Sequence, residues 1–341
     1  MLTGRLPYSG ESPVTVALKH IGDPVPRLDP AEGVSPALAA IVNRLLQKDP
    51  AHRFSSASDL ATALREAEPE LVVNLAEAFD GKSALESNVA ALLNLLDLRY
   101  TGSSPAGLML AGDKALSKKV LSFHGVLSPQ FATVHRGDVE WAGDLSFPLI
   151  VKPPQEDASI GITHASVVHN VQELLEQMSE VQGRFHQPPL VEQFIDGREF
   201  YVGVIGNADA RALPPLEMDF TGFPTDKPKI ASWSAKWGEE GAEDGAEYAG
   251  TRTVVPSDLT PELDETLRKT ALDAFHALRL RDYGRVDMRV TPKGEAYVIE
   301  VNPNCYLEKS GEFARAAELD GMEYDALIGR LIELASARYA R

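Results

Sequence analysis

The sequence of 341 residues contains one cysteine, Cys305. A single cysteine excludes an internal disulfide and any zinc site built from several cysteines. No apolar run approaches about 18 residues, and the N-terminus lacks a basic-then-apolar signal pattern, so neither a membrane span nor secretion is predicted. Basic residues are also scarce, 33 against 50 acidic ones, which argues against coating nucleic acid or anionic lipid. We therefore expect a cytoplasmic protein without a nucleic-acid or membrane partner.

The composition, 44% hydrophobic and 24% charged, suits a folded chain of more than one domain. Apolar side chains at helical spacing predict helices over 36–46 and 57–67. Beyond residue 70, helices and strands alternate, which indicates an α/β or α+β protein. The predicted strands cover 71–75, 147–153, 190–195, 198–206, 284–290 and 295–301, and the predicted helices cover 90–98, 114–124, 171–182 and 261–278.

Residues 282–304 form two alternating strands around a Pro-Lys-Gly turn, the pattern of a β-hairpin. With the turn centred on its Lys-Gly step, Asp287 faces Glu300 and Arg285 faces Asn302. These four side chains share one face with Arg289. The opposite, core-facing side is predicted to carry Val286, Met288, Val290, Ile299 and Val301.

Like charges directly opposed on neighbouring strands destabilise a sheet. A divalent cation held by Asp287, Glu300 and the amide oxygen of Asn302 would remove that repulsion, and an all-oxygen ligand set suits Mg²⁺. The alternative is a solvated sheet face on which Arg285 and Arg289 neutralise the two acids.

Cationic residues upstream offer phosphate contacts. Lys152 leaves the buried strand FPLIV, and Lys114 stands near a helix start, where backbone donors also favour anions. The following EDASIG loop, with Ser159 and Gly161, could cover phosphates with its backbone N–H groups, although one glycine is a weak signal. The alternative for Lys152 is an ordinary lysine at a strand end. Lys118 and Lys119 are expected on a solvated helix face.

Glu192 and Glu199 lie within LVEQFIDGRE. The apolar VEQFI could form an adenine slot, and an acid seven residues further on could bind ribose. The alternative is a pair of surface acids on consecutive strands. The histidines form no metal-ligand set, and Cys305 has no base near it in sequence to make it a nucleophile.

Taken together, ordered motifs from about Asn74 to the C-terminus resemble the ATP-grasp ligases, in their D-alanine–D-alanine ligase-like branch. The motifs are NLAEAFDGKSALESNVAALLNLLDLRYTGSS, GDKALSKKVLSFHG, FPLIVKPPQEDASIG, LVEQFIDGREF, LPPLE, SAKW, GRVDMRV and EVNPN. The resemblance implies an α+β ATP-grasp fold of two α+β subdomains over 108–341. Residues 70–107 would be a truncated, Rossmann-like remnant of the preceding substrate domain.

The resemblance also implies roles for individual residues. Lys114 and Lys152 would contact ATP phosphates, under a loop containing Ser159 and Gly161. The adenine would meet Glu192 and the backbone near Phe194 and Ile195, and Glu199 would hold the ribose. The metal ligands would be Asp287, Glu300 and Asn302, and the catalytic residues would be Arg285, Lys236 and Ser310.

The implied reaction uses ATP and Mg²⁺ or Mn²⁺. A carboxylate is phosphorylated to an acylphosphate, and an amine then displaces phosphate to form an amide or peptide bond. The substrates would be small molecules, such as an amino acid or a short peptide, and a homodimer is one oligomeric state that the resemblance suggests.

Three departures from the family pattern leave D-alanine open as the substrate. Asp157 and Ala158 stand where those enzymes carry Gly and Ser, and Asn304 stands where they have a Pro-Gly turn. The early strands of the family's substrate domain have no counterpart before LVVNL. A nucleotide-binding but catalytically impaired protein is therefore the alternative to an active ligase.

Residues 1–67 resemble the C-terminal end of a bacterial Ser/Thr protein kinase domain, most specifically in LLQKDPAHRF. The kinase Gly-rich loop, catalytic Lys, HRD and DFG motifs are missing, so 1–69 is predicted to be an all-helical, non-catalytic kinase C-lobe remnant. Arg53 lacks its usual acidic partner and is predicted to be exposed or paired anew. A kinase-derived interaction module fused to the ATP-grasp domain is a further alternative.

Overall fold

The computed structural model describes residues 40–41, 43–44, 57–79, 82–135, 138–142, 144–157, 159–224, 227–233, 235 and 250–340. The chain divides into two compact units, one of residues 1–72 with 92–99 and one of 73–91 with 100–341. Over the described ranges, no helix is both long enough and apolar enough to cross a membrane.

In the first unit, helix α3 (Ala57–Ala67) confirms the predicted helix over 57–67. Residues 40–41 and 43–44 are helical within the predicted 36–46 segment, whereas Arg53 lies outside the described residues. The predicted strand over 71–75 is wrong. Only Val72 pairs there, its N–H donating to the Arg99 carbonyl at 2.8 Å, and one such contact does not propagate a strand.

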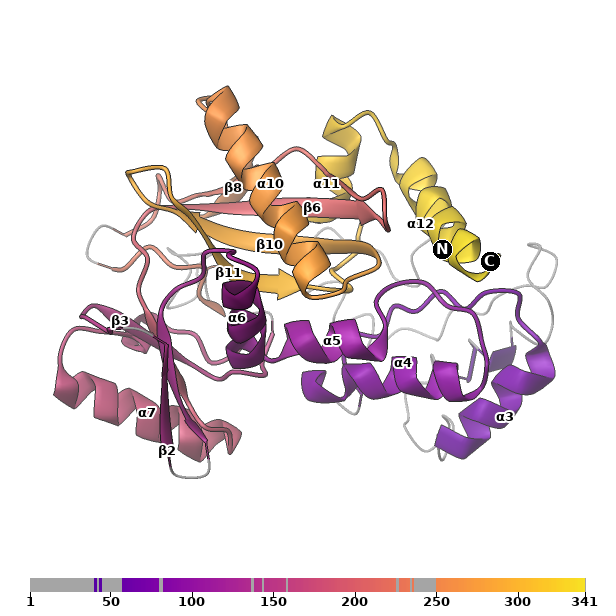
Figure 1. Cartoon of the computed structure of the whole chain (residues 1–341), viewed down its shortest axis with the longest axis horizontal. Helices are drawn as coiled ribbons and strands as arrows, with labels where there is room; N and C mark the ends of the chain where they lie inside the picture. Colours follow the sequence, from indigo (N-terminus) through magenta and orange to yellow (C-terminus); the bar gives the residue numbers. More distant parts are fainter. Residues whose placement is uncertain are drawn as a thin grey trace. The chain divides into compact units, whose positions relative to one another are not determined.

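The larger sheet of the second unit is antiparallel, with strand order β11-β10-β6-β8-β9 and the short β7 beside β6. Its strands are β6 (Arg198–Gly206), β7 (Arg211–Ala212), β8 (Leu216–Asp219), β9 (Arg252–Val254), β10 (Asp282–Val290) and β11 (Ala296–Asn302). Two groups of helices cover its two faces, α10 (Pro261–Ala277) on one and α11 (Glu312–Leu319) with α12 (Tyr324–Tyr339) on the other (Figure 1).

Alternation along these strands explains the two-sided burial. On one face Phe200, Val286 and Met288 pack against α10, and on the other Ile205 and Tyr283 pack against α11 and α12. Burial of such side chains is the main stabilising term, at about 25 cal/mol per Å² of apolar surface. The central strands β6 and β10 are therefore buried along nearly their whole length.

The smaller sheet is also antiparallel, in the order β2-β1-β5-β3-β4. Its strands are β1 (Phe131–His135), β2 (Asp138–Ala142), β3 (Leu149–Lys152), β4 (Val167–Val168) and β5 (Leu190–Gln193). Helix α7 (Val171–Phe185) packs on it through Leu174, Met178 and Val181 (Figure 1). Two antiparallel sheets, each covered by helices, confirm the expectation of an α+β fold.

The remaining helices are α4 (Glu86–Leu95), α5 (Pro105–Gly112) and α6 (Lys114–Phe123), with short 3₁₀ turns η3 (Ser83–Leu85) and η4 (His164–Ser166). Asp113 caps α6, because its side chain accepts hydrogen bonds from the N–H groups of Ala115 and Leu116. The cap fixes Lys114 as the first residue of the helix.

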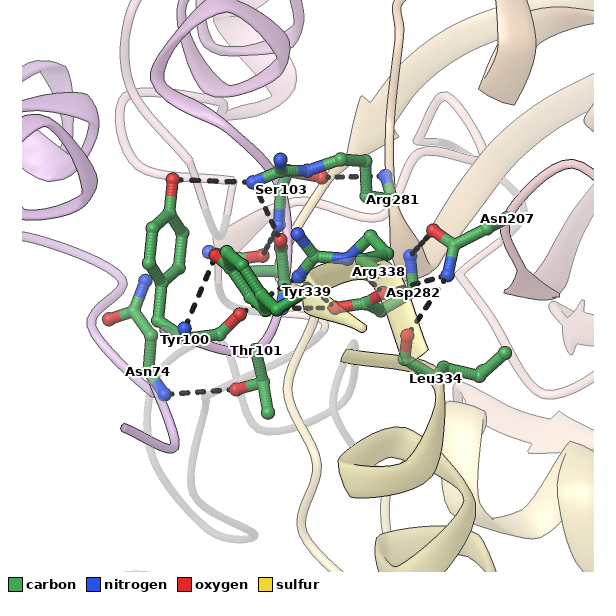
Figure 2. A network of polar contacts seen from close by, with 12 residues as sticks. Asn74, Tyr100, Thr101, Ser103, Asn207, Arg281, Asp282, Leu334, Arg338 and Tyr339 are labelled. Atoms are coloured by element: carbon green, nitrogen blue, oxygen red, sulfur yellow. Dashed lines mark hydrogen bonds and ion pairs between the residues drawn. The ribbon is translucent and has the colours of Figure 1, made fainter. Parts of the chain in front are cut away.

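A buried polar network ties the second unit together around Asp282, the first residue of β10 (Figure 2). The Asp282 carboxylate accepts two hydrogen bonds from Arg338 near the end of α12 and one from the backbone N–H of Gly102. The side chain of Asn207, which follows β6, donates a further bond to it. Residues distant in sequence thus meet at one fully buried carboxylate.

Candidate active site

A partly enclosed cavity of about 80 Å³ lies between the two sheets. It gathers most of the residues that the sequence singles out, from four separate stretches of chain. The predicted residues that line it are Lys114, Lys152, Ser159, Glu192, Phe194, Ile195, Glu199, Asp287 and Glu300. The sequence did not single out Ile150, Ile162, Gln193, Ile230 and Ala231, which also line it, together with Arg289 and Ile299.

The β10–β11 hairpin has the predicted pairing at its functional end. Asp287 pairs with Glu300, and Arg285 pairs with Asn302. Nearer the turn the prediction is wrong, because Val290 pairs with Ala296 and a register shift follows Asp287.

This register shift changes which side chains face the core. Met288 pairs with Val298, which is 1% exposed, instead of with Ile299. Ile299 was predicted on the core face, yet it lines the cavity beside Glu300. A β-bulge accounts for this, since the extra residue lets two neighbours point to the same side.

Arg285 and Asp287 form a two-pronged ion pair on β10. Arg285 Nε and Nη2 lie 2.7 and 2.9 Å from the two oxygens of Asp287, and Nη1 lies 3.3 Å from Glu312. Burial alone would lower the pKa of Arg285, but Asp287 and Glu312 outweigh it and raise that pKa. The arginine therefore does neutralise an acid, as the alternative interpretation held, but on a buried rather than a solvated face.

Lys114 bridges the hairpin and the loop after β3. Its Nζ lies 2.7 Å from Glu300 and 3.7 Å from Asp157, and it donates to the Glu156 carbonyl at 2.5 Å. Burial disfavours the charged form, but Glu300 and Asp157 outweigh this and raise the pKa of Lys114. The lysine is thus a buried cation whose present partners are carboxylates.

Glu192 lies between two lysines. Lys152 Nζ is 2.6 Å from one carboxylate oxygen, and Lys118 Nζ is 2.8 Å from the other. All three side chains are at most 4% exposed, so the expectation that Lys118 lies on a solvated face is wrong. Burial would raise the pKa of Glu192, but the two cations outweigh it and lower the pKa. The neighbouring Lys119 is exposed, as expected.

Glu199 is buried rather than on the surface, at 9% exposure. Arg289 Nη2 lies 2.9 Å from one of its oxygens, and the Tyr201 hydroxyl donates to the other at 2.9 Å. The Arg289 guanidinium also lies 5.6 Å from the centre of the Phe194 ring. An apolar slot beside a fixed carboxylate suits a base with its attached sugar.

The loop after β3, which contains Ser159 and Gly161, contacts the segment around Ala231. Ser159 adopts a left-handed φ of 61°, and its hydroxyl donates to the Ala231 carbonyl at 2.6 Å. Gly161 has φ 79°, and a Cβ there would stand 2.6 Å from the Phe185 ring, so only glycine fits.

The donor set on the hairpin fits Mg²⁺. In the described part of the chain, no group of three or more His, Cys, Asp or Glu side chains is placed to hold a metal. Mg²⁺ needs fewer, since it commonly takes one or two carboxylates with phosphate and water oxygens. Among the described residues, the buried side-chain nitrogen of Asn302 has no hydrogen-bond partner. The amide is therefore not held in an orientation that would point its oxygen away from a metal ion.

Of the five other predicted site residues, four do not line the cavity and the fifth is not described. Arg285 and Asn302 share the hairpin face with its metal-binding candidates, and Gly161 lies in the covering loop. Ser310 is exposed in the turn before α11. Lys236 lies outside the described residues.

Asn304, one of the departures from the family pattern, contacts a half-buried acid, Glu86. Its Nδ2 donates to Glu86 at 3.0 Å, while its Oδ1 accepts from the Ser103 N–H at 3.0 Å. Burial raises the pKa of Glu86 to about 8, against the opposing effect of the Asn304 bond. Cys305 beside it is buried, and burial raises its thiol pKa, so the structure agrees that it is a poor nucleophile.

The raised pKa of Glu86 predicts a pH dependence of stability. The folded chain keeps this proton up to about pH 8, whereas an unfolded Glu loses it near its ordinary value of 4.5. Between those values the folded state binds more protons, so the free energy of unfolding should fall as pH rises. Glu86→Gln should remove this part of the fall, and denaturant titrations at about pH 5 and about pH 9 measure it. Equal slopes for Glu86→Gln and the exposed-site control Glu318→Gln would contradict the prediction.

Comparisons with known proteins agree with this geometry. The family described as D-ala D-ala ligase C-terminus matches residues 119–333. A D-alanine–D-alanine ligase of Syntrophotalea carbinolica is 33% identical over 261 residues, covering 76% of this chain and 78% of the relative. An uncharacterized protein of Sinorhizobium fredii is 33% identical over 269 residues, covering 79% and 75%. A D-alanine–D-alanine ligase structure from Bacillus anthracis, complexed with ATP, shares the fold with a TM-score of 0.61 at 22% identity, covering 89% of this chain and 94% of that one.

Two facing antiparallel sheets around a lysine- and carboxylate-lined cavity define an ATP-grasp protein. The chain belongs to the D-alanine–D-alanine ligase family, and it is an ATP-dependent ligase that forms carbon–nitrogen bonds.

Proposed function

We propose that this chain uses ATP and Mg²⁺ to join a small carboxylate to the amine of an amino acid or short peptide. One observation carries the proposal: the Asp287–Glu300 pair faces the cavity that also receives Lys114 and Lys152. Two opposed carboxylates beside buried cations suit a metal-bound polyphosphate better than a structural core.

The nucleotide occupies the cavity between the sheets. Glu192 and the backbone near Phe194 and Ile195 meet the adenine, and Glu199 accepts from the ribose hydroxyls. Lys114 and Lys152 bind phosphates, and the backbone around Ser159 and Gly161 covers them. Support comes from the burial of Glu192 and Glu199 at the apolar wall of one cavity.

Asp287, Glu300 and Asn302 hold the metal ion. When bound, Mg²⁺ would neutralise charge on the phosphate oxygens during transfer. Glu300 now pairs with Lys114, so loading the site transfers Lys114 from a carboxylate to a phosphate. Because one cation replaces another at Glu300, the buried carboxylate stays compensated.

In the first step, a carboxylate oxygen of the substrate attacks the γ-phosphorus, the bond to the β,γ-bridging oxygen breaks, and ADP leaves. The neutral amine then attacks the acyl carbon, phosphate leaves with the bonding electrons, and the nitrogen loses a proton. Arg285 stabilises the charge on the transferred group. Lys236 contacts phosphate or substrate, and Ser310 binds a substrate carboxylate.

D-alanine is not assigned as the substrate. D-alanine is the substrate for which the relatives are named. Here the Asp157 carboxylate lies 3.7 Å from Lys114 in the phosphate loop, and Asn304 occupies the turn after the metal-binding strand. Both residues depart from the family pattern, one beside Lys114 and one directly after the proposed metal-binding strand, so a different carboxylate or amine is part of the proposal.

Three further parts of the proposal concern the whole chain: a cytoplasmic location, a homodimer, and a non-catalytic, kinase-derived segment over residues 1–69. Most of that segment lies outside the described residues. Deleting it should abolish docking to a partner while leaving nucleotide affinity intact if the segment is an interaction module.

Product formation tests the ligase proposal. With ATP, Mg²⁺ and pooled amino acids and short peptides, we expect ADP release together with a product whose mass equals the two substrates minus water. A chelator should abolish both signals, and added Mg²⁺ or Mn²⁺ should restore them. Mg-ATP binding by calorimetry without ADP release from any pool would favour the impaired, nucleotide-binding alternative. Absence of both would overturn the proposal.

A further inference from the structure

Three lysines, Lys114, Lys118 and Lys152, are buried in the described structure, and Lys118 is the one that does not line the cavity. It projects from α6 and is 1% exposed. Its Nζ contacts Glu192 at 2.8 Å and donates to the Ile299 carbonyl at 3.0 Å. Lys118 therefore contacts Glu192 from within the protein interior and not from the cavity.

Lys114 and Lys152 differ from Lys118 in position, because both line the cavity. Both now contact carboxylates, Lys114 at Glu300 and Lys152 at Glu192, so each binds a phosphate only if its side chain turns away from its acid. Lys152 then leaves Glu192 for a phosphate. A carboxylate that is 1% exposed would lose one of its two cations at that moment.

We propose that Lys118 is a positioning residue, a fixed counter-ion that keeps Glu192 paired and oriented when Lys152 turns to the nucleotide. This inference rests on the proposed function, in which Glu192 meets the base and Lys152 meets a phosphate. Without Lys118, Lys152 is the remaining cation within ion-pair distance of Glu192 among the described residues, and its departure would leave the acid buried and unpaired.

The second contact of Lys118 extends the role to the metal side. Ile299 is the extra residue at the β11 bulge, and it directly precedes Glu300. A hydrogen bond from Lys118 to the Ile299 carbonyl holds this distorted backbone in place. One buried ammonium thus supports both the base-binding acid and the strand that carries a proposed metal ligand.

Calorimetric titration of the full chain with Mg-ATP tests the inference. Lys118→Met should weaken nucleotide affinity by at least about 30-fold, because Lys152 stays on Glu192. The control Lys119→Met, one position along the same helix but exposed, should change affinity less than about twofold.

A double variant separates positioning from mere packing. In Lys118→Met combined with Glu192→Gln, no buried carboxylate retains Lys152, so affinity should recover at least about fivefold relative to Lys118→Met alone. A purely structural Lys118 predicts no recovery and would overturn the inference. If Lys118→Met does not fold, Lys118→Gln replaces it in the same comparison.

The outcomes also separate this inference from the proposed function. Wild-type chain that fails to bind Mg-ATP overturns the proposed function itself. Wild-type chain that binds, with Lys118→Met binding equally well, overturns only the role of Lys118.

Discussion

Replacing Arg285 with Met is expected to lower kcat for ADP release by about 10³-fold, while Mg-ATP affinity changes less than about threefold. Arg285 holds both oxygens of Asp287 and approaches Glu312, so its guanidinium is fixed beside the proposed metal face. A positive charge that is held in place before phosphoryl transfer stabilises the transition state more than it stabilises the ATP-bound ground state. Single-turnover and steady-state ADP release measure the effect, with calorimetry for binding.

Arg289 is the matched control, because it lies four residues after Arg285 on the same face of β10. It pairs with Glu199, where the ribose is proposed to bind. Arg289→Met should therefore raise KM for ATP more than it lowers kcat. Arg285→Met that keeps kcat within threefold of wild type would remove Arg285 from the proposed chemistry. Arg285→Lys should recover little, since an ammonium cannot make the two-pronged contact with Asp287.

The functional end of the hairpin was predictable because its pattern is local. Two strands of period two around a short turn place Asp287 opposite Glu300 from the sequence alone. Two deviations offset each other to give this result. The strand pairing next to the turn differs by one residue from the predicted register, and the bulge after Asp287 restores the alignment.

The features of the fold and the site that were not predicted depend on tertiary contacts. Lys118 lies in the charged stretch KALSKK, and helical periodicity alone does not show that Glu192, from a distant strand, meets it inside the protein. Ile299 faces the cavity because of a bulge that has no proline or glycine to mark it. The β1–β2 hairpin was missed, and 71–75 was taken for a strand on apolar content although pairing there is confined to Val72.

The family motifs offered a better signal for the cavity than any one residue did. Lys152 alone fits an ordinary lysine at a strand end, yet the structure buries it at 3% exposure against Glu192. Similarly, Glu199 alone fits a surface acid. The order of several weak motifs grouped these side chains in one predicted site, because a shared fold constrains all of them together, and the structure places both of them at one cavity.

Replacing Asp282 with Ala is expected to lower the free energy of unfolding by about 3–5 kcal/mol. Asp282 is fully buried and accepts hydrogen bonds from Arg338, Asn207 and the Gly102 N–H (Figure 2). Its removal leaves the Arg338 guanidinium, 14% exposed, without its carboxylate. Denaturant titration measures the loss, and the end of α12 should lose hydrogen-exchange protection first because Arg338 anchors it.

Two variants make this prediction specific. Asp282 has a left-handed φ of 64°, which Asn tolerates and Ala does not, so Asp282→Asn should destabilise less than Asp282→Ala. Asp273→Ala on α10 removes an exposed acid that pairs only with Lys269 four residues earlier among the described contacts, and it should cost less than about 0.5 kcal/mol. Equal losses for Asp282→Ala and Asp273→Ala would show that the network around Asp282 does not anchor α12. The ligase then has to gain its stability from the two apolar faces of the large sheet, where α10, α11 and α12 pack without help from this carboxylate.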